Sequence, residues 1–265
     1  MNGMKANKIF YAFILLLLMP LTISVAQVSG ISGGKLCVPD ASTLSTGSFE
    51  FEPSFSVVNA SNKFGDNGAM ESLSGRNISS NVMFRVTAGV ADGLEIGTAF
   101  SSTIEQVSVG SKYILTGAGK FHLALIAGVS LPAGNKFIAD TLQDNDNHLT
   151  SSYGSIASLK LAESSSLDMI LSYTRIHGVH PFNNILSYGI GAGKWFSEKF
   201  QGVVELNGFA TWDGKLHSDK LSLTPGITYK ISPILLFVFG TQVDLIGKNE
   251  DKDFGYFSAF TISFN

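Results

Sequence analysis

Residues 82–100 read VMFRVTAGVADGLEIGTAF, and this stretch decides the fold class. Apolar residues alternate with polar or small ones on both sides of Ala91-Asp92-Gly93, a tripeptide typical of tight turns. A side-chain period of two is the pattern of a β-strand, so the stretch predicts two antiparallel strands joined by a hairpin turn.

The same alternation recurs from Phe49 to the C-terminus and predicts twelve strands. Short turns such as Gly117-Ala118-Gly119 mostly alternate with longer connections, expected near residues 60–78, 132–152, 176–184, 212–219 and 246–253. This rhythm places the long loops at one end and both termini at the other, as in outer-membrane barrels. The predicted fold class is all-β: a closed antiparallel up-and-down transmembrane β-barrel of about 12 strands.

The two faces of the strands favour a membrane over water. One row holds Gly, Ser, Thr and a few charges, which suits a polar lumen, whereas the aliphatic row has almost no charged residues. Aromatic residues gather near both ends of the strands, as expected at membrane interfaces. Closure pairs every backbone group internally, which lipid requires. A secreted, soluble β-sandwich is the alternative fold.

The N-terminus predicts export. Lys5 and Lys8 precede an apolar run over residues 9–23, and Ser24-Val25-Ala26 supplies the small residues of a cleavage site. Residues 1–26 are therefore predicted to be a signal peptide cleaved near Ala26, with an uncleaved anchor as the alternative. Residues 27–47 are predicted to form a periplasmic lead-in that could also plug the lumen, and residues 48–265 the barrel.

The predicted localisation is the cell outer membrane, with its lipid bilayer as one partner. The last strand carries Tyr256, Phe260, Ile262 and Phe264 in alternation. It resembles the terminal strand that the barrel assembly machinery recognises, although Asn265 follows the last aromatic residue. That machinery is therefore a predicted partner during insertion.

Charge and cysteine content exclude other classes of protein. Without Lys5 and Lys8 the chain keeps 16 basic residues against 21 acidic ones, a formal net charge of −5. An acidic balance gives no reason to expect a nucleic-acid partner. The single cysteine, Cys37, excludes an internal disulfide.

Charged residues on the polar rows are the candidate site. Arg85, Lys112 and Glu205 should lie near mid-membrane. Glu50, Glu52, Glu95, His122, Lys160, Asp168 and Lys230 should lie towards the periplasmic end, and Asp244 towards the outer end. Twelve strands enclose a backbone radius of roughly 12 Å, which allows a narrow channel or a filled polar core. The charges either select solutes, as in pores, or form structural ion pairs.

The segment Gly34 to Phe55, GKLCVPDASTLSTGSFEFEPSF, carries a family resemblance. Its Val38-Pro39, Thr46-Gly47 and the strand from Phe49 to Pro53 resemble the opening of a family of outer-membrane transporters of the phenol-degradation meta-pathway type. The resemblance implies a barrel transporter. It does not carry over a substrate.

The favoured function is an outer-membrane channel or transporter for small solutes, by passive passage through a narrow charged lumen. A non-transporting structural or binding barrel is the alternative. A barrel enzyme such as a phospholipase is disfavoured, because no histidine lies two residues from a serine on a lipid-facing row. No catalytic residue, cofactor or metal site is predicted. The acidic stretch with Asp140, Asp144 and Asp146 lacks the glycine and terminal glutamate of a calcium loop.

Overall fold

The alternating segments form strands throughout. The structure, a computed structural model, describes residues 28–33, 35–133, 148–177, 184–212 and 215–264. Within them twelve strands follow one another without a helix: β1 Phe49–Phe64, β2 Met70–Ala91, β3 Leu94–Ser101, β4 Gln106–Ala118, β5 Phe121–Pro132, β6 Thr150–Ala162, β7 Ser165–Ile176, β8 Asn184–Trp195, β9 Phe200–Trp212, β10 Leu216–Ser232, β11 Leu235–Lys248 and β12 Glu250–Phe264. The predicted signal peptide, residues 1–26, lies outside the described residues.

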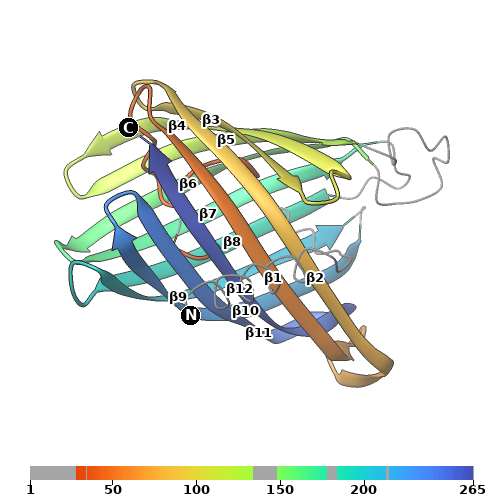
Figure 1. The fold of residues 1–265 in the computed structure, drawn as a ribbon. Coiled ribbons are helices and arrows are strands. Elements are labelled where there is room, and N and C mark those ends of the chain that lie inside the picture. Colours follow the sequence, from red (N-terminus) through yellow and green to blue (C-terminus); the bar gives the residue numbers. More distant parts are fainter. Residues whose placement is uncertain (1–27, 34, 134–147, 178–183, 213–214, 265) are drawn as a thin grey trace, which may run out of the picture.

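The strands close into a barrel (Figure 1). Each strand pairs antiparallel with its neighbours in the sequence, and β12 pairs with β1 to complete the ring. Closure leaves no sheet edge, so every strand finds partners on both sides. The predicted closed antiparallel barrel of twelve strands is confirmed.

The barrel wall has an apolar outside and a polar inside. Large apolar side chains are exposed on the outer face, among them Val86, Ile96, Val109, Leu125, Val129, Met169, Leu171, Ile190, Val204, Leu206 and Phe239. Buried polar side chains face inwards, among them Thr87, Glu95, Lys112, Asp168, Glu205 and Thr224. This is the reverse of a water-soluble protein and fits a barrel surrounded by lipid.

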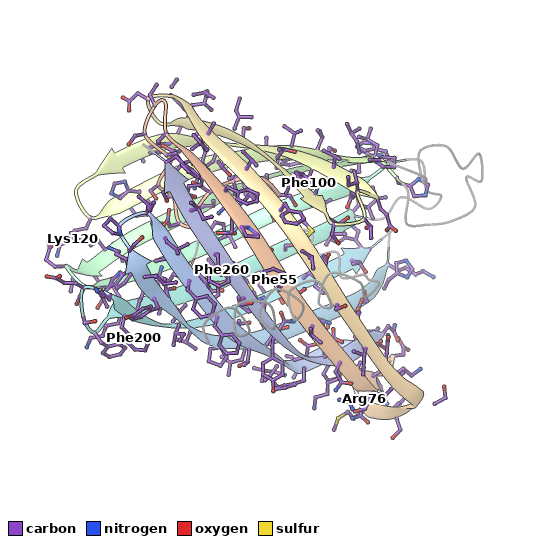
Figure 2. The ribbon with its side chains drawn as sticks, viewed as in Figure 1. Phe55, Arg76, Phe100, Lys120, Phe200 and Phe260 are labelled. Atoms are coloured by element: carbon purple, nitrogen blue, oxygen red, sulfur yellow. The ribbon has the colours of Figure 1, made fainter. Side chains whose placement is uncertain are left out.

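Aromatic side chains lie at both ends of the wall. At the end with the short turns, Phe49 stacks on Phe264 with ring centroids 4.4 Å apart. At the other end the Tyr173 ring lies 6.0 Å from that of Trp212. Figure 2 shows the side chains standing off the wall, with Lys120 and Phe200 near one end and Arg76 at the opposite one. Among the described residues, no helix is long and apolar enough to cross a membrane.

Three connections differ from the expected long loops, one of them at 212–219, where β10 already starts at Leu216. Residues 60–78 are mostly strand, because β1 continues to Phe64 and β2 starts at Met70. Only Asn249, with a φ of 52°, separates β11 from β12. Outside lipid both faces of a strand can be polar, so the period of two disappears while the backbone pairing continues. The resulting β1–β2 hairpin extends beyond the rest of the barrel (Figure 1).

The chain before β1 lies inside the barrel, in the half nearer the short turns. Val28, Ile31, Val38 and Ala41 are buried there and form one apolar cluster with Ala124, Ile126, Ile156 and Ile170 of the wall. Residues 28–47 are named here the lumenal segment. They belong to the stretch 27–47, which the sequence predicts to be a periplasmic lead-in that could also plug the lumen. The structure places the described part of this segment in the lumen, since its apolar side chains and backbone groups find partners on the wall.

If lipid surrounds the apolar outer face, the loss of stability caused by a charge on that face should depend on its depth in the bilayer. Leu171, 51% exposed near the middle of β7, should tolerate arginine poorly, because a charge at the bilayer midplane costs about 2–4 kcal/mol. Leu161, 54% exposed at the short-turn end of β6, is the matched control, at about 0–1 kcal/mol. Urea titrations of folding into liposomes would measure both variants. Equal losses of stability at the two positions would contradict the placement in a membrane.

Candidate functional site

The lumenal segment contacts opposite sides of the barrel. Residues 29–32 contact β2, β3 and β4, whereas residues 35–38 contact β7, β8 and β9. These two groups of strands face each other across the ring of twelve. From residue 40 the chain returns towards the first side, where the Leu44 N–H bonds to Glu95. The segment therefore spans the lumen and comes back before β1 begins.

On the first side a buried ion pair holds the backbone of the segment. Glu95 and Lys112 face each other in register on β3 and β4, with Lys112 Nζ 3.3 Å from Glu95 Oε1. Glu95 accepts the backbone N–H groups of Ser32 and Leu44 at 2.6 and 3.0 Å. Lys112 donates to the carbonyls of Ser32 and Asp40 at 2.8 and 3.2 Å. Because both side chains are 0% exposed, the segment supplies the polar partners that water would otherwise give them.

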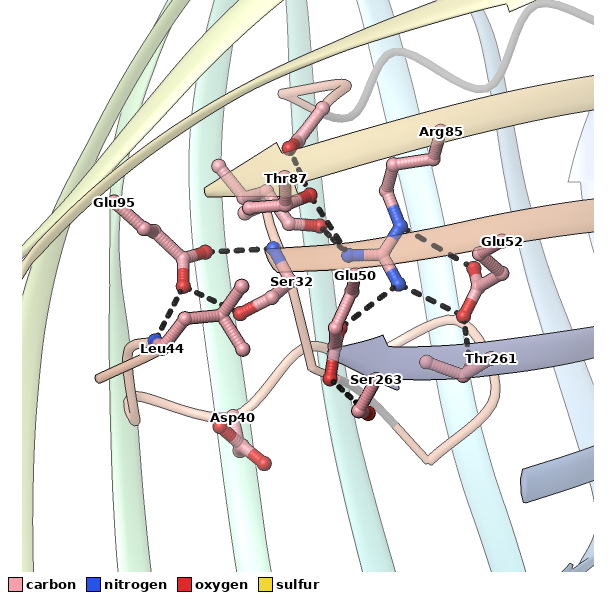
Figure 3. A network of polar contacts seen from close by, with 12 residues as sticks. Ser32, Asp40, Leu44, Glu50, Glu52, Arg85, Thr87, Glu95, Thr261 and Ser263 are labelled. Atoms are coloured by element: carbon pink, nitrogen blue, oxygen red, sulfur yellow. Dashed lines mark hydrogen bonds and ion pairs between the residues drawn. The ribbon is translucent and has the colours of Figure 1, made fainter. Parts of the chain in front are cut away.

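Arg85 connects the segment to the seam of the barrel (Figure 3). Its guanidinium donates to the Ile31 carbonyl at 2.7 Å and pairs with Glu52 at 2.8 Å and Glu50 at 3.6 Å. Thr261 and Ser263 of β12 donate to those two carboxylates. Arg85, on β2, therefore binds the lumenal segment and two carboxylates of β1. The same carboxylates accept hydrogen bonds from β12, where the barrel closes.

On the opposite side Glu205 of β9 binds three successive backbone N–H groups. Leu36, Cys37 and Val38 donate to its carboxylate at 3.0, 2.6 and 3.0 Å. Next to it, the Lys35 ammonium pairs with Asp168 of β7. In register, Gly191 of β8 stands between Asp168 and Glu205. The wall therefore holds this part of the segment by two carboxylates on one level.

Glycines on the inner face make room for the segment. A Cβ atom on Gly97 would lie 2.0 Å from the Gly30 carbonyl oxygen, and one on Gly110 would lie 2.1 Å from that of Ser29. A Cβ atom on Gly193 would lie 2.3 Å from Lys35 Cε. The alternating pattern alone predicts only that these glycines face the lumen. Glycine within a strand is a signal of close backbone approach, and here it marks the path of the segment.

A separate cluster lies nearer the outer end. Lys220 Nζ lies 3.0 Å from Asp244 and 2.5 Å from Asp253, and Ser222 donates to Asp244. Asp244 was predicted to lie here, whereas Lys220 and Asp253 were missed. Asp253 lies in the loop expected at 246–253, and Lys220 directly follows the one expected at 212–219, whereas in the structure β12 and β10 run through these positions.

Three further predicted residues lie near the short turns and bind other groups than the lumenal segment. Lys160 pairs with the exposed Glu163 of the β6–β7 turn at 2.8 Å, and this hydrogen bond lowers the pKa of Glu163. Lys230 Nζ lies 5.4 Å from the centre of the Trp195 ring. The His122 ring lies beside Gly117 near the short-turn end. These side chains belong to the rim of the barrel.

The burial of the central charges shows whether they line a water-filled path. Lys112 and Glu95 are 0% exposed and Glu205 is 1% exposed. In this structure they bind the lumenal segment and do not line a water-filled path. The hypothesis of a pore lined by Arg85, Lys112 and Glu205 therefore requires the segment to move.

A serine and a histidine meet at the outer end of β6 and β7. Ser151 Oγ lies 2.8 Å from His177 Nε2. A nucleophile needs such a base, and catalytic sites add a third group that orients the base and donors that stabilise an oxyanion. Among the described residues, no hydrogen bond from a third side chain to His177 and no metal-binding group of three His, Cys, Asp or Glu is found.

No family model matches the chain, and no curated protein matches its sequence significantly. Solved structures do match the fold. The COG4313 outer membrane channel from Pseudomonas putida F1 superposes with a TM-score of 0.64 at 13% identity, over 85% of this chain and 98% of that one. The NanC porin gives 0.55 at 8% identity, over 81% and 99%. The KdgM porin gives 0.52 at 9% identity, over 82% and 99%. At these identities the likeness shows the fold of outer-membrane barrels.

The contacts of Glu205 predict the effect of removing it. Glu205→Ala leaves three N–H groups of the segment without their acceptor, and a hydrogen bond to a charged group contributes about 1.5–3 kcal/mol. Cys37, the lone cysteine, should then react with a maleimide about tenfold faster or more. Glu163→Ala, which removes an exposed carboxylate on a turn, should leave the rate unchanged. An unchanged rate in Glu205→Ala would show that this carboxylate does not hold the segment.

Proposed function

We propose that the protein is an outer-membrane channel for small solutes, and that solutes pass through the lumen when the lumenal segment is displaced. The observation that carries this proposal is the pairing of the wall charges. Asp168 and Glu205 bind groups of the segment, and Lys112 gives two of its hydrogen bonds to the segment's carbonyls. A purely structural barrel would be expected to pair such charges within its wall.

The dimensions of the barrel support passage of small molecules. Twelve strands enclose a backbone radius of roughly 12 Å, and side chains occupy part of it. Without the segment, the half of the lumen near the short turns would be wide enough for a narrow, water-filled path between polar walls. Passage would be passive and would follow the concentration difference of the solute across the membrane.

The exported location belongs to the same proposal. A signal peptide cleaved near Ala26 and insertion by the barrel assembly machinery both fit a barrel with an apolar outer face. The resemblance to transporters of the phenol-degradation meta-pathway type stays a prediction. The three structural neighbours named above are themselves described as a channel and two porins, which supports the proposed channel.

Two alternatives have an observation in their favour. A non-transporting barrel fits the tight binding of the segment, whose contacts leave Lys112 and Glu95 fully buried. A barrel phospholipase fits the pair of Ser151 and His177 at the outer end. A lipase assay on the folded protein and on Ser151→Ala tests the enzyme: hydrolysis that depends on Ser151 would establish it.

A reversible lock tests the channel. The Ala41 N–H donates to Ser158 Oγ at 2.8 Å, so the Cα atoms of these residues lie within the separation of about 6.8 Å that a disulfide allows. The chain with Ala41→Cys and Ser158→Cys, in a Cys37→Ser background, should conduct in planar bilayers when reduced and lose conductance when oxidised. Cys37→Ser alone, under the same redox conditions, is the control.

The outcomes separate the proposals. Conductance that survives oxidation would show that solutes do not need the segment to move. A reduced protein without any conductance, together with a wild type that does not swell liposomes in small solutes, would favour the non-transporting barrel.

A further inference from the structure

The ammonium group of Lys35 occupies a cradle in the barrel wall. Asp168 pairs with this ammonium, and the carboxylates of Asp40, in the segment itself, and of Glu205 in the wall also attract it electrostatically. The stem of the side chain lies against Gly193, where a Cβ atom would be 2.3 Å from Cε and 2.7 Å from Nε2 of Gln201. The cradle therefore consists of two carboxylates, a glycine floor and an amide, and it already holds an alkylammonium ion that is tethered to the segment.

If the segment were displaced, some charges of the wall would keep a partner within the wall and others would lose theirs. Glu95 on β3 and Lys112 on β4 would keep the ion pair between them. Arg85 would keep its ion pair with Glu52, which is 2.8 Å long in this structure. Asp168 would lose the Lys35 ammonium, and Glu205 would lose the three backbone N–H groups of the segment.

We propose that this cradle is a solute site for organic ammonium ions, and that the open channel prefers cations for the same reason. The inference rests on the proposed displacement of the segment. It deepens that proposal because it names the class of solute and the residues, Asp168 and Glu205, that select it. Lys35 acts as a tethered competitor that fills the site while the lumen is closed.

The spacing favours an ammonium over a metal ion. Asp168 and Glu205 stand on β7 and β9 with Gly191 between them, and strands two apart are separated by about 9.5 Å. A single metal ion binds oxygens at about 2.0–2.6 Å, so it would need both side chains to turn towards a point between their strands. An ammonium with an aliphatic chain can pair with one carboxylate, feel the field of the other and lie on the glycine floor, as Lys35 does.

The first experiment removes the Lys35 side chain and tests whether a free alkylammonium ion binds in its place. Lys35→Ala removes the part of the side chain that n-propylammonium would replace. Loss of the charged contact should raise the alkylation rate of Cys37 about tenfold. Excess n-propylammonium chloride should bring the rate back towards that of the wild type, whereas potassium chloride at equal ionic strength should not. The double variant K35A/D168N should gain no protection from n-propylammonium, and the shift in gel mobility on heating checks that each barrel is folded.

The result has two sides. Protection by n-propylammonium that depends on Asp168 supports the cradle. No protection in a folded Lys35→Ala chain, equal protection by potassium, or protection that persists in K35A/D168N would overturn it. This readout measures binding, so it is independent of whether the protein conducts.

The second experiment measures selectivity in the full-length protein. In a potassium chloride gradient the reversal potential of the open wild-type channel should indicate a preference for potassium over chloride. The charge-neutral pair D168N/E205Q should reduce that preference, and Glu163→Gln, which neutralises an exposed turn carboxylate, should not. Absence of current would count against the proposed channel, whereas current that prefers chloride would overturn the cation preference alone.

Discussion

The structure depends on one constraint: in lipid, every backbone N–H and C=O group must find its partner within the protein. A sheet of twelve strands meets this constraint only if its first and last strands pair, as β1 and β12 do. Once the ring is closed, its size is set by the number of strands, and its alternating side chains must divide into a lipid-facing and a lumen-facing set. The polar lumen therefore follows from the same requirement that closes the wall.

A polar lumen of this width creates a second requirement, because charges that lose water need other partners. In the half near the short turns those partners come from the lumenal segment. Its carbonyls bind Lys112 and Arg85, its N–H groups bind Glu95 and Glu205, and Lys35 pairs with Asp168. The backbone of an irregular segment has unpaired donors and acceptors, so it can satisfy both signs of charge. Among the described residues of the segment, main-chain groups make most of these contacts, and Lys35 is the charged side chain that pairs with the wall.

The fold could be predicted from the sequence because the period of two and the turn residues are local signals. The pattern also singled out Glu95, Lys112, Asp168 and Glu205 as candidate charges, since they interrupt rows of small residues. Their partners could not be found in this way. Which groups meet inside a barrel depends on register and on the path of the lumenal segment, and a single sequence shows neither. The outer hairpins were missed for another reason: beyond the membrane both faces of a strand are wetted, and the alternation on which the prediction rests is absent.

The position of the lumenal segment before β1 has a consequence for the order of assembly. The ring closes through contacts as distant as the one between Glu52 and Thr261, 209 residues apart, whereas Ser32 and Glu95 are only 63 residues apart. Contacts over short sequence separation cost less chain entropy to form. The segment can therefore attach to β3 and β4 before the last strands arrive, and the wall can curl around it. With this order of assembly, the segment is already bound to the wall when the final strand meets the first and encloses it.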